Sequence, residues 1–130
     1  MTQYLLALYR DYDQPIPAER TEQVWADVSE LGDKLTAAGA FVFQGGMDGG
    51  PESATVVRPS GGGFLVTDGP YTETKEHLAG FWIIEAPNRD AALEWAKLTA
   101  AAQQRAIEVR AFFDGDLDEA IERSAPGAGG

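Results

Sequence analysis

The fold is decided by residues 78–90, which read Leu78-Ala79-Gly80-Phe81-Trp82-Ile83-Ile84-Glu85-Ala86-Pro87-Asn88-Arg89-Asp90. Residues 78–86 are strongly apolar and rich in aromatic and β-branched side chains, as expected of a strand. Asn88 is a good helix N-cap, and Asp90 favours a helix start through the helix dipole. The positions that follow share one helical face: Ala92, Trp95, Ala96 and Thr99. The stretch therefore predicts a buried strand that leads directly into an amphipathic helix.

The start of the chain repeats this pairing of a strand with a helix. Residues 3–9 form a short apolar run that is typical of a buried strand. Pro17 suits the first turn of a helix, and Gly39 suits its end. Between them, apolar side chains recur at steps of four, three and four: Val24, Val28, Leu31 and Leu35. Trp25 lies beside this face and can line a cleft.

The remaining segments add strands. Residues 41–43 predict a second strand, residues 54–58 and 64–67 predict a hairpin joined by a glycine-rich turn, and residues 106–112 predict a final strand. Without the hairpin, the order of elements is βαββαβ. We therefore predict an α+β fold of the ferredoxin-like class with an extra β-hairpin.

Both faces of the predicted sheet are apolar, although two helices can cover only one of them. In the first strand the two alternating sets are Tyr4, Leu6 and Leu8, and Leu5, Ala7 and Tyr9. A large uncovered apolar face needs a partner. A second copy of the sheet is the simplest one, so we expect a homodimer that forms a dimeric α/β barrel.

Composition limits the class of protein. The 130 residues fit one domain, and their hydrophobic share of 44% can form a core. With no cysteine and a formal charge of −11, the chain is expected to lack disulfides, to be cytoplasmic and to bind no nucleic acid directly. No signal peptide and no membrane-spanning run is evident. Residues 1–112 are expected to form the domain, residues 113–123 an acidic extension that can form a short helix, and residues 124–130 a disordered tail.

Asp68 is the first candidate for chemistry, because it ends a predicted strand at an Asp-Gly-Pro turn. Its carboxylate can cap the local backbone, or it can face a cleft as a general base. Tyr71, Glu73 and Lys75 follow in a polar segment, which is either a solvated loop or a cleft wall with Lys75 pairing an anionic ligand. Tyr9 and Arg10, at the end of the first strand, are further candidate ligand-binding residues.

The chain offers little for a metal or a cofactor. Its single histidine, His77, and its lack of cysteine leave no evident zinc site. Its glycine-rich loops lack the Gly-Lys-Ser/Thr ending of a phosphate loop. We therefore expect neither a metal nor a cofactor.

Residues 66–76 read Val66-Thr67-Asp68-Gly69-Pro70-Tyr71-Thr72-Glu73-Thr74-Lys75-Glu76. This segment resembles the signature of the DGPF proteins, a branch of the YCII-related family, with Tyr71 in the usual phenylalanine place. The resemblance extends over roughly residues 3–112 and includes the blocks at 78–86 and 90–96. It implies a dimeric α+β barrel. In the wider family a histidine–aspartate pair has been proposed as catalytic. This chain departs from that pattern, because its only histidine, His77, follows the signature segment and the first strand and helix contain none.

Three functions remain open from the sequence. The first is a regulatory or small-ligand-binding dimer, which the incomplete catalytic set favours. The second is an enzyme that acts on a small polar molecule, with Asp68 as the base. The third is an accessory protein that binds another protein. The resemblance implies that this partner is an extracytoplasmic-function sigma factor, since some DGPF genes lie near those of such factors.

Overall fold

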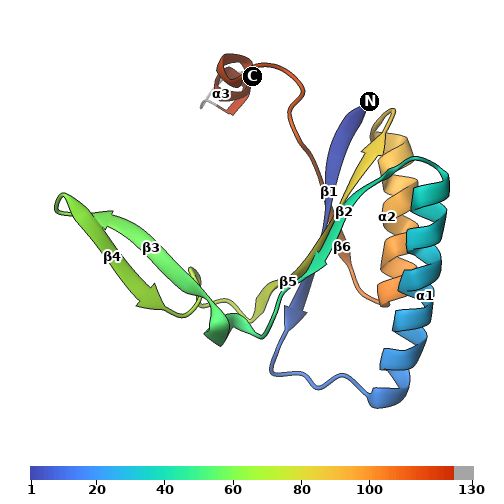
Figure 1. Ribbon diagram of the computed structural model, residues 1–130, viewed down its shortest axis with the longest axis horizontal. Coiled ribbons are helices and arrows are strands. Elements are labelled where there is room, and N and C mark those ends of the chain that lie inside the picture. Colours follow the sequence, from blue (N-terminus) through green and yellow to red (C-terminus); the bar gives the residue numbers. More distant parts are fainter. Residues whose placement is uncertain (125–130) are drawn as a thin grey trace.

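The computed structural model describes residues 1–124 and confirms the ferredoxin-like α+β fold (Figure 1). The elements are β1 (Thr2–Asp11), α1 (Ala18–Ala37), β2 (Phe41–Gly46), the 3₁₀ turn η1 (Pro51–Ser53), β3 (Thr55–Ser60), β4 (Gly63–Asp68), β5 (Glu76–Ala86), α2 (Arg89–Gln103), β6 (Ile107–Ala111) and α3 (Leu117–Ser124). Four strands form one antiparallel sheet in the order β2-β5-β1-β6. This is the strand order of the βαββαβ plan, with the hairpin β3–β4 inserted between its second and third strands.

Both long helices cover the same face of the sheet (Figure 1). The predicted apolar face of α1 is confirmed, since Leu31 and Leu35 are buried and Val28 packs against the core. The largest side chains that are fully buried come from both layers: Leu6, Leu35, Ile84 and Thr99. Alternation along β1 and β5 therefore places one set of side chains under the helices and the other set on the opposite face.

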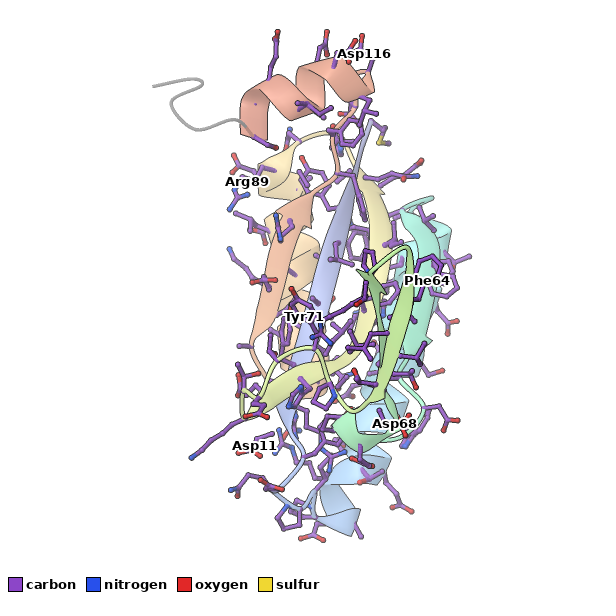
Figure 2. All side chains as sticks on the ribbon, turned by 90° about the vertical axis from the view of Figure 1, so that its left-hand side faces the viewer. Asp11, Phe64, Asp68, Tyr71, Arg89 and Asp116 are labelled. Atoms are coloured by element: carbon purple, nitrogen blue, oxygen red, sulfur yellow. The ribbon has the colours of Figure 1, made fainter. Side chains whose placement is uncertain are left out.

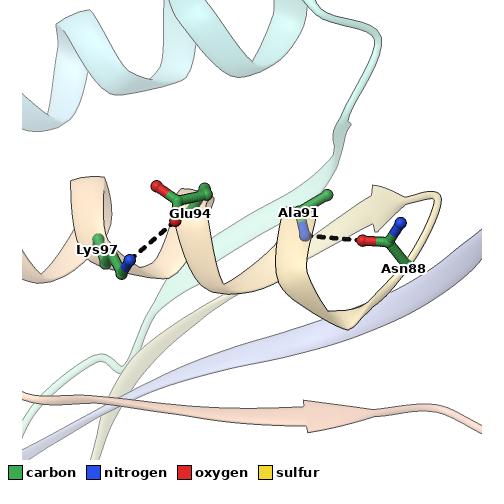
Figure 3. A network of polar contacts seen from close by, with 4 residues as sticks. All are labelled: Asn88, Ala91, Glu94 and Lys97. Atoms are coloured by element: carbon green, nitrogen blue, oxygen red, sulfur yellow. Dashed lines mark hydrogen bonds and ion pairs between the residues drawn. The ribbon is translucent and has the colours of Figure 1, made fainter.

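The predicted cap of α2 is also confirmed (Figure 3). The side-chain oxygen of Asn88 accepts a hydrogen bond of 2.9 Å from the backbone N–H of Ala91. It thereby satisfies one of the N–H groups that a helix leaves free at its first turn. One turn further on, Lys97 and Glu94 form an exposed ion pair at 2.8 Å.

The hairpin β3–β4 pairs only with itself and projects away from the sheet, on the side opposite the helices (Figure 1). The glycine run predicted to close it does so with positive φ angles of 53° at Gly61 and 83° at Gly62. Apolar side chains on the hairpin are exposed: Val57, Phe64, Leu65 and Val66.

The face of the sheet away from α1 and α2 is not covered by any helix of residues 1–124. Leu5, Phe81 and Ile83 are half-buried on it, and Phe43 is 50% exposed. After β6 the chain continues into α3, which lies on the same side as the hairpin (Figure 1). The tail predicted at 124–130 lies outside the described residues, apart from Ser124, which ends α3. No helix in residues 1–124 is long and apolar enough to cross a membrane.

Candidate functional site

The polar segment after β4 is exposed. Asp68, Glu73 and Lys75 all lie at the surface, and the Asp68 carboxylate accepts no hydrogen bond from residues 1–124. The guanidinium of Arg58 lies over the ring of Tyr71, 5.5 Å from its centroid. Asp68 and Tyr71 lie well apart in Figure 2. Within the described residues, Asp68 therefore shows no capping bond to the backbone of its own turn.

Tyr71 lines a small cavity of about 280 Å³ together with His77 and residues of the 47–54 loop. No cluster of three or more histidine, aspartate or glutamate side chains that could hold a metal ion occurs in residues 1–124. His77 therefore has no set of co-ligands in the described part of the chain.

Tyr9 and Arg10 point to opposite sides of the sheet. The Tyr9 hydroxyl donates a hydrogen bond of 3.3 Å to a carboxylate oxygen of Glu108, on the uncovered face. Burial, followed by the Glu108 charge, raises the pKa of the Tyr9 phenol. Arg10 lies on the helix side, where it lines a cavity of about 380 Å³ with Tyr12 and Arg105. Its guanidinium is 4.6 Å from the centroid of the Tyr12 ring.

A larger cavity of about 560 Å³ lies between α1 and the sheet. The α1 wall includes Val24, Trp25 and Val28, so the prediction that Trp25 can line a cleft agrees with the structure. The opposite wall is formed by the sheet and includes several small residues: Gly45 and Gly46 of β2, and Ala79 and Gly80 of β5. These residues have little or no side chain, so they leave space beneath the first turns of α1.

Trp82 forms part of the sheet wall of this cavity. Its side chain is only 3% exposed, and its indole Nε1–H finds no hydrogen-bond acceptor among residues 1–124. An unsatisfied buried donor costs about 1–3 kcal/mol, and such groups are rare in folded proteins. The Nε1 atom is itself shielded from solvent, so Trp82 contributes to this wall through its ring and not through this donor.

Three arginines from separate segments gather where the two larger cavities meet. Arg20 and Arg105 line the larger one, and Arg10 and Arg105 line the smaller one. Arg20 donates a hydrogen bond of 2.7 Å to the backbone carbonyl of Gln104, just after α2. Burial, then the charges of Arg20 and Arg10, lower the pKa of the Arg105 guanidinium.

Sequence reasoning identified Arg10 but missed Arg20, Arg105 and Trp82. Arg20 carries one local signal, because it lies in the first turn of α1. The helix dipole favours acidic side chains at that place and disfavours a cation. Residues that go against the local preference of their helix or strand are often found at functional sites.

A four-stranded ferredoxin-like sheet with two helices on one face and an open cavity beneath the first helix defines a small α+β domain. The family model described as YCII-related domain matches residues 2–114, and the chain belongs to this family. An uncharacterized protein of Rhizobium meliloti (strain 1021) is 37% identical to it over 86 residues. That match spans 61% of this chain and 63% of the relative, which is less than two thirds of the relative's length.

Proposed function

We propose that this chain is a small-molecule-binding module whose site is the cavity between α1 and the sheet. The observation that carries the proposal is a cavity of about 560 Å³ whose lining is mostly apolar and includes two cationic side chains, Arg20 and Arg105. Ligand sites typically measure roughly 300–1,000 Å³ and combine apolar walls with a few polar groups. The catalytic alternative has less support, since Asp68 is exposed and is not among the residues that line this cavity.

The indole N–H signals of the tryptophans test the proposal by nuclear magnetic resonance. Trp25 and Trp82 line the cavity, whereas Trp95 of α2 does not. Titration with 2-phenylethanol, a small neutral probe, should shift the Trp82 and Trp25 signals and leave the Trp95 signal in place. Equal shifts of all three signals, or no shift at all, would argue against a site in this cavity.

Filling the cavity should abolish this binding. Val24 is half-buried on the α1 wall, so Val24→Phe places a larger side chain in the space that the probe would occupy. We expect the Trp82 shift to be lost while the far-ultraviolet circular dichroism stays unchanged. Ala26→Phe, at an exposed position of the same helix that does not line the cavity, is the matched control and should bind as the wild type does.

We also propose that the module works as a homodimer through the uncovered face of the sheet. The accessible surface of the chain is 8982 Å². A compact monomer of this mass is expected to expose about 6,700 Å². The excess of one chain is larger than the roughly 1,000 Å² that each partner contributes to a stable homodimer, since such dimers bury on the order of 2,000 Å² or more over both chains. Exposed apolar side chains on the hairpin and on α3, both on the uncovered side, would add to such an interface.

A further inference from the structure

We propose that the ligand of this cavity is an anionic amphipathic molecule whose carboxylate or phosphate group binds at Arg10, Arg20 and Arg105. Its apolar body would lie along the α1 wall of the larger cavity. The inference rests on the proposed function of the cavity and adds the chemical class of the ligand.

Charge supports the choice of an anion. The chain carries 21 acidic and only 10 basic residues, yet three of the basic residues gather at this one place. The ion pairs found in residues 1–124 lie elsewhere, at Glu30–Lys34 and Glu94–Lys97. Like charges held close together are unfavourable, and the nearby Glu76 charge offsets only part of this cost. A bound anion would remove that cost, so the cluster favours a negatively charged ligand.

Free hydrogen-bond donors support the same choice. Arg20 donates one N–H group to the carbonyl of Gln104, so this arginine also binds the C-terminal end of α2. The side chains of Arg10 and Arg105 donate no hydrogen bond to residues 1–124. A guanidinium presents its donors in a planar fork that matches carboxylate and phosphate oxygens. The free guanidinium donors of Arg10 and Arg105 can therefore hold one oxyanion.

The environment of the Arg105 charge agrees with this geometry. Burial and the neighbouring charges of Arg20 and Arg10 lower the pKa of its guanidinium, and the Glu76 charge opposes them only in part. The cluster thus has an electrostatic cost in the empty protein. A ligand that brought a negative charge would lower this electrostatic cost.

The linings of the two adjoining cavities match an amphipathic ligand, with a cationic end and an apolar end. They share Leu8, Ile16, Ala79, Gln103 and Arg105, so the arginine cluster adjoins the larger space directly. Beyond the cluster, the larger cavity is lined by apolar side chains: Val24, Trp25, Val28 and Phe41. A charged head at the arginines would place an attached apolar body against these side chains.

The test compares four probes that share size or charge: phenylacetate, phenyl phosphate, 2-phenylethanol and inorganic phosphate. Calorimetry gives each affinity, and the Trp82 indole signal reports entry into the cavity. We expect at least one of the two aromatic anions to bind about tenfold or more tightly than 2-phenylethanol, since charge-assisted hydrogen bonds are strong. Added salt should weaken the anions and leave the neutral probe unaffected. The better of the two anions distinguishes a carboxylate ligand from a phosphate ligand.

Arg105→Gln should reduce the affinity for the preferred anion about tenfold and leave the affinity for 2-phenylethanol unchanged. Unchanged binding of 2-phenylethanol also shows that the variant is folded. Arg110→Gln, at an exposed arginine of β6 that lines neither cavity, is the matched control and should bind like the wild type. Two results would contradict the anionic ligand but leave the proposed function of the cavity standing. The first is equal affinity for the anions and the neutral probe. The second is an equal loss of anion affinity in Arg105→Gln and Arg110→Gln. If none of the aromatic probes shifts the Trp82 indole signal, both the anionic ligand and the proposed function of the cavity are wrong.

Discussion

Gly80 shows how one residue shapes the cavity wall. A Cβ atom added at Gly80 would lie 2.9 Å from the carbonyl oxygen of Gly45, on the neighbouring strand. Because that oxygen belongs to the backbone, β2 would have to move. We expect Gly80→Ala to lower the free energy of unfolding by about 1–3 kcal/mol, as overpacking does in well-packed interiors. Thermal unfolding followed by circular dichroism measures the change.

Gly32 supplies the control for this substitution. It lies within α1, and an added Cβ would meet nothing within 4 Å. Gly32→Ala should raise the free energy of unfolding by about 0.5–1 kcal/mol, because alanine loses less conformational freedom in a helix than glycine does. A drop in stability at both positions would contradict the assignment of a specific backbone contact at Gly80.

The arginine cluster marks the limit of sequence reasoning about single residues. Arg10 could be identified because it ends a predicted strand close to a predicted cleft. Arg20 and Arg105 could not, because they meet Arg10 only after the β1–α1 connection and the end of α2 have folded against each other. No spacing along the chain encodes such a meeting.

At the scale of elements, the cap of α2 yields a direct prediction. Asn88→Ala should lower the free energy of unfolding by about 1 kcal/mol, because the N–H of Ala91 loses its acceptor at the helix start. Chemical denaturation monitored by circular dichroism measures the difference. Asn88→Asp keeps a capping oxygen and should remain close to the wild type.

The ion pair one turn away separates capping from general surface electrostatics. Glu94→Ala removes the exposed partner of Lys97 and should change stability little, since exposed pairs contribute weakly. If Glu94→Ala were as damaging as Asn88→Ala, the stability of α2 would depend on surface charge and not on its cap.

Periodicity and turn residues predicted the type of each strand and helix of the fold, but not every boundary. The second strand was expected to end at residue 43, because Gly45 and Gly46 suggest a turn. In the structure these two glycines pair with Phe81 and Gly80 of β5, so β2 continues to Gly46. The partner strand overrides the weak intrinsic preference of glycine, and tertiary pairing of this kind has no local signal.

At the scale of the whole molecule, the separation of the two faces is the main feature. The helix side contains the core and the cavity, whereas the other side exposes apolar residues of the sheet, the hairpin and α3 (Figures 1 and 2). The alternating strands predicted that both faces would be apolar. They could not predict how far the hairpin projects, because β3 and β4 pair only with each other and their direction depends on the connections at their base.

The proposed homodimer follows from this uncovered face and can be tested on it. Phe43 is half-exposed beside Phe81, with their ring centroids 5.8 Å apart, so a charge there should be tolerated by the monomer but not by an apolar interface. We expect light scattering after size-exclusion chromatography to give twice the chain mass of 13.9 kDa for the wild type and a single chain mass for Phe43→Lys. Leu98→Lys, at an exposed apolar position of α2, should remain dimeric. A monomeric wild type, or a Phe43→Lys variant that stays dimeric, would mean that this face does not join two copies of the chain.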